Sequence, residues 1–141
     1  MPSQLRIGPP AVSLRVPSEV HYFATGVLLE PGATYEIRAD NSEWSDASHA
    51  CTASGNPDPV LAQRVFQGLL RCQDANWFAL IGAAGPSDAQ LFPVGMGRQW
   101  TFEPVGESDE AAPELQLFAN DAIGFYWNNS GSIGVTIERI S

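Results

Sequence analysis

Apolar residues alternate with polar ones along much of the chain, and these stretches are separated by Pro, Gly, Asn and Ser. A period of two that is interrupted by turn residues is typical of β-strands. The pattern predicts about eight short strands, as in a β-sandwich or jelly roll. The predicted strands cover residues 12–16, 20–29, 33–39, 76–83, 90–94, 98–102, 114–119 and 133–140.

Two segments depart from simple alternation. Residues 76–83 are almost continuously apolar, which predicts a strand that is buried on both faces. Residues 60–70 carry Leu61, Val65 and Leu69 at helical spacing and predict one short helix. The chain is therefore expected to be almost entirely β.

The length of 141 residues corresponds to one domain with a real core. The first 19 residues carry Pro9, Pro10 and Pro17 around a short apolar run. Because proline is tolerated at sheet edges, residues 1–19 are interpreted as an N-terminal arm or edge strand. Residues 20–141 then form a single β-sandwich domain.

Two loops and two cysteines complete the outline. Residues 40–59 are predicted to form a long polar loop, in which Trp44 is either an anchor folded onto the core or an exposed platform for a ligand. Residues 105–113 are acidic and are expected to form a solvated loop. Cys51 and Cys72 are interpreted with equal weight as a disulfide or as two reduced thiols.

The net charge of −9, with seven arginines and no lysine, excludes some partners. An acidic chain without a basic cluster argues against binding to nucleic acid or to anionic membrane surfaces. It is compatible with binding cations or neutral ligands. No apolar run is long enough to span a membrane, and the first residues lack the regions of a signal peptide. We expect a cytoplasmic protein, or one exported by a route that the sequence does not show.

Catalytic motifs are not evident in the sequence. It contains no Gly-x-Ser-x-Gly elbow, no phosphate-binding glycine loop and no His-Glu-x-x-His. His21 and His49 have no evident nucleophile partner, and no carboxylate pair stands out as an acid and base. We therefore expect a protein that is not an enzyme.

The most informative stretch is residues 120–131, between the last two predicted strands. It offers the carboxylate of Asp121 and the carboxamides of Asn128 and Asn129. Hard cations such as calcium prefer this oxygen-rich ligand set, although the spacing is not that of an EF-hand. Asn, Asp, Ser and Gly are also ordinary turn residues, so a tight connection without a ligand is the alternative.

Residues 115–137 resemble the C-terminal segment of the calcium-dependent galactose-binding lectins of bacteria, the PA-I-type (PA-IL-like) family. The shared pattern is a strand ending in Asn120-Asp121, then Gly124, an aromatic residue and Asn128-Asn129-Ser130-Gly131-Ser132. Weaker similarity extends upstream to about residue 20. The resemblance implies a jelly-roll-like, galactose-binding-like β-sandwich of two antiparallel sheets, with one Ca²⁺ at its rim.

The resemblance also implies the residues of the site. The implied metal ligands are the side chains of Asp121, Asn128 and Asn129 and the backbone carbonyls of Phe125 and Ala47. The implied sugar-binding residues are Asp121, Asn128, Gln67, Ala122 and Trp127. Two vicinal hydroxyls of a galactose-type sugar would complete the coordination of calcium.

Three positions differ from the family pattern. Trp127 replaces a glycine of the best-known member, and it could either stack on a sugar or block the site. Arg64 replaces the histidine of a His-x-x-Gln sugar contact, whose glutamine corresponds to Gln67. The loop that contains Trp44 has gained residues.

The primary hypothesis is a calcium-dependent lectin that binds galactose or galactosides, and the family suggests a homo-oligomer, a dimer or a tetramer. The alternative is a non-catalytic interaction or structural domain that has lost sugar or calcium binding. A hydrolase is a distant third hypothesis.

Overall fold

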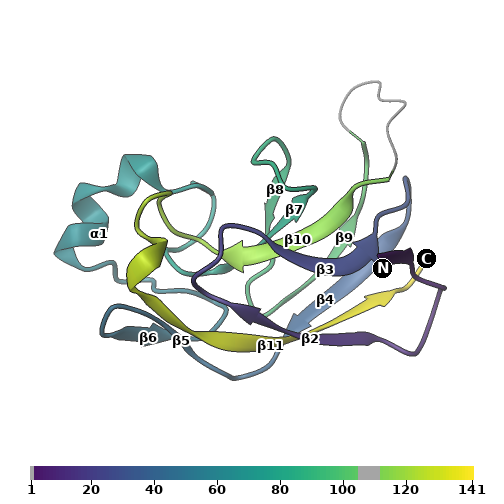
Figure 1. The fold of residues 1–141 in the computed structure, drawn as a ribbon, viewed down its shortest axis with the longest axis horizontal. Helices are drawn as coiled ribbons and strands as arrows, with labels where there is room; N and C mark the ends of the chain where they lie inside the picture. The colour runs from purple at the N-terminus through teal and green to yellow at the C-terminus, as the bar shows by residue number, and fades with distance from the viewer. Residues whose placement is uncertain (1, 105–111) are drawn as a thin grey trace.

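The computed structural model describes residues 2–104 and 112–141 (Figure 1). Within these ranges the chain forms eleven strands in two sheets, one short α-helix and two 3-10 turns. The prediction of an all-β sandwich is therefore confirmed. The predicted acidic loop at residues 105–113 falls mostly outside the described residues.

The first sheet has the strand order β1-β3-β10-β7-β8. All of its pairings are antiparallel except the short parallel contact of β1 with β3. Its strands are β1 (Ser3–Gln4), β3 (Phe23–Leu28), β10 (Glu114–Ala119), β7 (Leu80–Ala84) and β8 (Leu91–Pro93).

The second sheet has the order β6-β5-β11-β4-β9, and β2 also pairs with β11. β11 is the central strand, because it pairs with β2 along one edge and with β4 and then β5 along the other. The strands of this sheet are β2 (Val12–Pro17), β4 (Thr34–Ala39), β5 (Trp44–Asp46), β6 (His49–Cys51), β9 (Gly97–Thr101) and β11 (Asn129–Arg139).

The core lies between the two sheets and follows the alternation seen in the sequence. Ile133, Val135 and Ile137 of β11 are buried, as are Leu115 and Leu117 of β10. These alternate positions share one face of each strand, so each sheet contributes an apolar inner face to a single core.

The structure corrects the prediction for residues 40–59, which form a hairpin, β5–β6, rather than an irregular loop throughout. Each strand of the hairpin has three residues, which is too short for alternation to be recognised. Trp44 in β5 is fully buried and its Nε1 donates a hydrogen bond to the Phe78 carbonyl at 2.9 Å. Of its two interpretations, the core anchor is therefore the one observed.

The apolar run at 76–83 is only partly a strand. β7 begins at Leu80, and its first four residues are buried, as expected for a strand covered on both faces. Residues 76–79 form a turn, in which Phe78 has a positive φ of 65°. An apolar run by itself cannot separate a buried turn from a buried strand.

The predicted helix is present as α1 (Leu61–Val65), followed by a 3-10 turn, η1 (Gln67–Leu69). Its buried residue is Gln63, whereas Leu61, Val65 and Leu69 are exposed. α1 lies at one end of the sandwich, and both chain termini lie at the opposite end (Figure 1).

Cys51 and Cys72 are free thiols in this structure. Burial raises the pKa of the Cys51 thiol to about 11, which keeps it protonated and weakly reactive at neutral pH. None of the described helices has the length and apolar composition needed to span a bilayer.

Candidate metal centre

The candidate centre lies where the chain passes from β10 in one sheet to β11 in the other. The connection begins with Asn120, which is fully buried. Its Oδ1 accepts a hydrogen bond from the Cys72 N–H at 3.0 Å, and its Nδ2 donates to the carbonyls of Cys72 at 2.9 Å and Asn76 at 3.0 Å. Asn120 thereby fastens the start of the connection to the segment before β7 and fixes the position of the next residue, Asp121.

Asp121 and Asn129 lie in direct contact and are 1% and 5% exposed. Asp121 Oδ1 accepts from the Ala122 N–H at 2.7 Å, and its Oδ2 accepts from Asn129 Nδ2 at 3.1 Å. The same Nδ2 donates to the Ser18 carbonyl at 2.9 Å. Both amide hydrogens of Asn129 are thus engaged, which fixes the orientation of its carboxamide.

Asn128 and Asn129 each carry an unsatisfied side-chain oxygen. Asn128 Oδ1 and Asn129 Oδ1 are both buried and have no hydrogen-bond partner within the described residues. Most buried polar atoms in folded proteins are satisfied, and each one that is not costs about 1–3 kcal/mol. Two adjacent orphan acceptors beside a buried carboxylate fit a bound cation, so the residues present suit Ca²⁺.

The protonation of Asp121 responds to the same surroundings. Burial raises the pKa of this carboxyl to about 6, and the charge of nearby Asp46 acts in the same direction. The hydrogen bonds from Ala122 and Asn129 oppose that rise. A bound cation would favour the charged carboxylate, because an opposite charge lowers the pKa of a neighbouring acid.

The two predicted backbone ligands lie in the same region. Ala47 occupies the β5–β6 turn with a positive φ of 54°, and its N–H donates to the Asn128 carbonyl at 3.0 Å. Phe125 precedes η2 (Tyr126–Asn128), and its N–H donates to the Ala122 carbonyl at 3.0 Å. Coordination by the carbonyls of Ala47 and Phe125 stays a prediction.

A pocket of about 220 Å³ opens beside these residues. It brings together four predicted site residues, Asp121, Phe125, Trp127 and Asn128. Trp127 is 80% exposed and can meet a ligand at the pocket wall. The pocket is lined by Asp46, Ala62, Gln63, Phe66, Trp77, Asp121, Phe125, Trp127 and Asn128.

Two predicted sugar contacts lie outside that lining. Gln67 is exposed, and its Oε1 accepts a hydrogen bond from Trp77 Nε1 at 2.7 Å, so it supports a pocket residue. Ala122 is fully buried and packs with Leu70, Trp77 and Phe125. Direct sugar contacts from Gln67 and Ala122 stay predictions.

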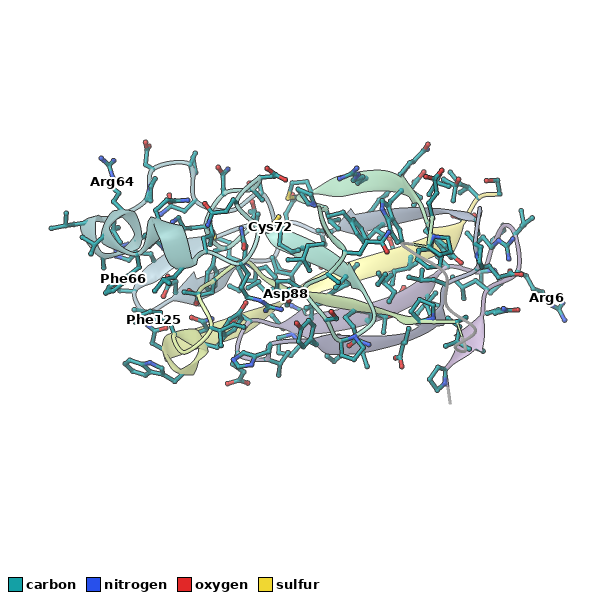
Figure 2. The ribbon with its side chains drawn as sticks, turned by 90° about the horizontal axis from the view of Figure 1, so that it is seen from above. Arg6, Arg64, Phe66, Cys72, Asp88 and Phe125 are labelled. Atoms are coloured by element: carbon teal, nitrogen blue, oxygen red, sulfur yellow. The ribbon has the colours of Figure 1, made fainter. Side chains whose placement is uncertain are left out.

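Five pocket residues were not predicted from the sequence: Asp46, Ala62, Gln63, Phe66 and Trp77. Asp46 ends β5 and is paired in register with Asn129 of β11. Gln63 donates from Nε2 to Asp46 Oδ2 at 2.9 Å. The Phe66 ring lies 5.0 Å from that of Phe125, and Figure 2 shows the two at the α1 end. Asp46 comes to lie beside Asn129 only through the pairing of β5 with β11, which is distant in the sequence.

A buried arginine, Arg71, fixes the position of the turn η2. The side chain of Arg71 is 2% exposed and pairs with Asp88 at 2.7 Å. Its Nη1 donates to Tyr126 Oη at 2.7 Å, and Tyr126 Oη donates to the Ala119 carbonyl at 2.6 Å. The guanidinium also lies 3.6 Å from the centre of the Phe118 ring. Arg71 thus fixes Tyr126 and, with it, the turn η2 that presents Asn128.

The donor set constrains the kind of metal. Among the described residues, no group of three or more His, Cys, Asp and Glu side chains is placed to hold an ion. A metal here would depend on one carboxylate, two amide oxygens and backbone carbonyls. Such all-oxygen sites suit calcium, whereas structural zinc sites use thiolates and imidazoles.

Comparisons with known proteins show a similarity of fold. The scan against protein families finds no match, and the search of curated proteins finds none either. Among solved structures, the chain is similar to the N-terminal domain of EclA, described as a PllA-like lectin, with a TM-score of 0.63. The alignment covers 91% of this chain and 95% of that one at 22% identity. A likeness at this identity shows that the two chains share a fold.

Proposed function

We propose that this chain is a non-enzymatic, calcium-dependent carbohydrate-binding protein of the lectin type, whose ligand is a galactose-type sugar. The observation that carries the proposal is the pair of buried, unpartnered oxygens of Asn128 and Asn129 beside Asp121. A protein that served only as a scaffold would gain nothing from leaving these acceptors unsatisfied.

The chemistry of calcium links the metal to a sugar. Calcium takes six to eight oxygen ligands at flexible angles. The three side chains and the carbonyls of Phe125 and Ala47 would leave positions for water or for two vicinal hydroxyls. A diol that replaces two waters gains affinity, because the ion is already held in place. The O3 and O4 hydroxyls of galactose form such a diol.

The surroundings of the centre suit a sugar ring. Phe66, Phe125 and Trp127 line the pocket and offer apolar surface. Sugars have apolar faces made of C–H groups, and small-molecule sites commonly combine aromatic walls with a few polar anchors. The similarity of the fold to a lectin domain supports the same conclusion. In this account Trp127 stacks on the ligand.

The direct test replaces Asp121. The Asp121→Asn variant keeps the shape of the side chain and removes the only charged side-chain ligand of the proposed site. We expect the unmodified chain to bind galactose-coated beads in calcium and to be released by a chelator. We expect Asp121→Asn to lose at least about tenfold in affinity, as for a lost charge-assisted contact. Asp74→Asn, at an exposed carboxylate, is the matched control.

Undiminished binding by Asp121→Asn would reject the assigned site. Binding that persists in the chelator would reject the role of calcium.

A second function, an interaction domain without a sugar ligand, is favoured by one observation. Five large apolar side chains around α1 and the 120–131 loop are more than half exposed: Leu61, Val65, Leu69, Ile123 and Trp127. Clustered exposed apolar residues commonly mark protein interfaces. This function predicts a melting temperature that does not respond to calcium, whereas a bound ion stabilises the folded state by mass action.

A further inference from the structure

A second carboxylate faces the pocket. Asp46 ends β5 directly opposite Asn129 and lines the pocket together with Asp121 and Asn128. Its charge reaches the centre, since it contributes to the raised pKa of Asp121. In the described part of the chain, Asp46 makes no ion pair with an arginine or histidine.

Gln63 fixes the orientation of Asp46. Gln63 is 5% exposed, and its Oε1 accepts hydrogen bonds from the Val60 N–H at 3.1 Å and from Asn56 Nδ2 at 3.4 Å. Because these two donors occupy the oxygen, the amide nitrogen must point the other way, to Asp46 Oδ2 at 2.9 Å. This clamp holds the carboxylate at the pocket wall.

The second carboxylate oxygen remains available. No hydrogen bond to Asp46 Oδ1 occurs within residues 2–104 and 112–141. The residue is only half-buried, so this oxygen can meet water or a ligand. It is an acceptor without a donor of its own, and its natural partner is a hydroxyl or ammonium group.

The unusual choice of buried and exposed side chains in α1 supports a functional reason for the hydrogen bond from Gln63 to Asp46. The helix buries its glutamine and exposes the apolar side chains of Leu61 and Val65. A helix that served only the core would show the reverse arrangement. The orientation of α1 is therefore the one that delivers the Gln63 amide to Asp46.

The charge of the loaded site limits its ligands. Asp46 and Asp121 together carry two negative charges, which a calcium ion would balance. A neutral sugar keeps this balance, whereas an acidic sugar would add a negative charge beside Asp46. Like charges in a partly desolvated pocket repel, and such repulsion is an effective source of specificity.

We propose that Asp46, oriented by Gln63, is a specificity-determining residue that accepts a hydrogen bond from a hydroxyl or amino group of the bound sugar and disfavours sugars that carry a carboxylate. This inference rests on the proposed function and adds a second anchor on the pocket wall. Asp46 acts on the ligand directly, and Gln63 is a positioning residue.

The test compares three sugars by calorimetry in saturating calcium: galactose, galactosamine and galacturonic acid. The Asp46→Asn variant is informative because its amide oxygen can still accept from Gln63, which turns the amide nitrogen to the pocket. At the position of Asp46 Oδ1, the substitution therefore replaces a hydrogen-bond acceptor with a hydrogen-bond donor. Asp58→Asn, at an exposed carboxylate in the segment before α1, is the matched control.

We expect the unmodified chain to bind galactose and galactosamine more tightly than galacturonic acid. In Asp46→Asn the affinity for galactose should fall about tenfold, as for one lost charge-assisted hydrogen bond. The affinity for galacturonic acid should stay the same or rise. The ratio of the affinity for galactose to that for galacturonic acid should therefore fall, to one or below. Asp58→Asn should behave as the unmodified chain.

A variant at Gln63 separates positioning from direct contact. Gln63→Met keeps the length of the side chain and removes its three hydrogen bonds, including the one to Asp46. We expect the affinity for galactose to fall by a smaller factor, about threefold. The ratio of the affinity for galactose to that for galacturonic acid should fall as in Asp46→Asn. An unchanged preference in this variant would overturn the positioning role.

Three results would overturn the proposal for Asp46. The first is an Asp46→Asn variant with the same three affinities as the unmodified chain. The second is an Asp46→Asn variant that loses calcium itself to the extent that Asp121→Asn does, since Asp46 would then be a metal ligand. The third is an unmodified chain that binds calcium but none of the three sugars, which would overturn the proposed function as well.

Discussion

Asn120 and Asn129 illustrate two opposite uses of the same side chain within one connection. Asn120 has partners for both its oxygen and its nitrogen, all of them backbone groups, and it holds the fold. Asn129 satisfies its nitrogen through Ser18 and Asp121 and leaves its oxygen free. The difference separates a structural asparagine from one that is prepared for a ligand.

Asn128 provides a test at this scale. Replacing it with alanine removes a buried orphan acceptor, so the free energy of unfolding without calcium should not fall and should rise by up to about 1–3 kcal/mol. In the unmodified chain, calcium at a hundredfold excess over its Kd should raise the stability by about 2.7 kcal/mol, or on the order of 8 °C in Tm. Asn128→Ala should lose most of this rise.

The measurement is thermal unfolding by circular dichroism, in calcium and in a chelator. Asn41→Ala, at an exposed asparagine, is the control and should keep the full calcium response. If Asn128→Ala responds to calcium as strongly as the control does, its oxygen is not a ligand.

The grouping of Asp121 with Asn128 and Asn129 could be predicted from the sequence, because all three lie within nine positions of one connection. Asp46 and Gln63 could not. They reach the same pocket through a strand pairing and a helix orientation, and neither leaves a local signal in the sequence. Residues that converge through long-range packing need the fold before they can be found.

At the scale of elements, the β5–β6 hairpin positions the site by its contact with β11. Gly131 of β11 pairs with Trp44 of β5 and has a positive φ of 87°. A Cβ at this glycine would lie 3.1 Å from the Trp44 Cα and 3.2 Å from the Glu43 carbonyl oxygen. Both the backbone conformation and the close approach therefore require glycine.

Gly131→Ala should lower the free energy of unfolding by about 2–3 kcal/mol, the sum of a left-handed backbone and a steric clash. Gly32→Ala is a matched control, because Gly32 has a φ of 82° but open space around it. Its expected cost is about 1 kcal/mol. Denaturant unfolding of both variants measures the difference, and equal costs would contradict the close packing of β5 on β11.

The ion pair behind the loop predicts a dependence on pH. The hydrogen bond from Arg71 lowers the pKa of Asp88. The charged carboxylate therefore contributes stability at pH values above its unfolded pKa of about 3.9, and this contribution is lost as pH falls through the folded pKa. Asp88→Asn should lower stability at pH 7 by about 1–2 kcal/mol, less than for a fully buried pair, because the Asp88 side chain is 36% exposed.

Thermal unfolding from pH 7 to pH 3 checks this expectation. The difference in stability between Asp88→Asn and the unmodified chain should disappear as pH falls below about 4. Glu19→Gln, at an exposed residue, should show no such convergence. A difference in stability that stays constant with pH would mean that the ion pair contributes no stability.

Strand prediction succeeded where the alternating pattern was long enough. The run at 114–119 coincides with β10 (Glu114–Ala119), and the predicted strand at 33–39 overlaps β4 (Thr34–Ala39). The three-residue strands β5 and β6 were missed because each is too short to show alternation and because β5 pairs with β11, far away in the sequence. The apolar turn before β7 was assigned to the strand because burial, not strand geometry, sets its composition.

At the scale of the molecule, the sandwich separates the site from the chain ends. The proposed centre and α1 lie at one end, and both termini lie at the other (Figure 1). An assembly that joined subunits through the terminal end would leave each pocket open to a multivalent glycan. A dimer or tetramer stays a prediction, which sedimentation would test.

The central claim is that calcium, held by Asp121, Asn128 and Asn129, makes the pocket competent for a sugar. The most direct measurement is calorimetry on chelator-stripped protein, with calcium titrated first and galactose second. We predict one calcium per chain, and heat from galactose only after calcium is bound. Galactose heat of equal size in the chelator, or the absence of any calcium binding, would contradict the account.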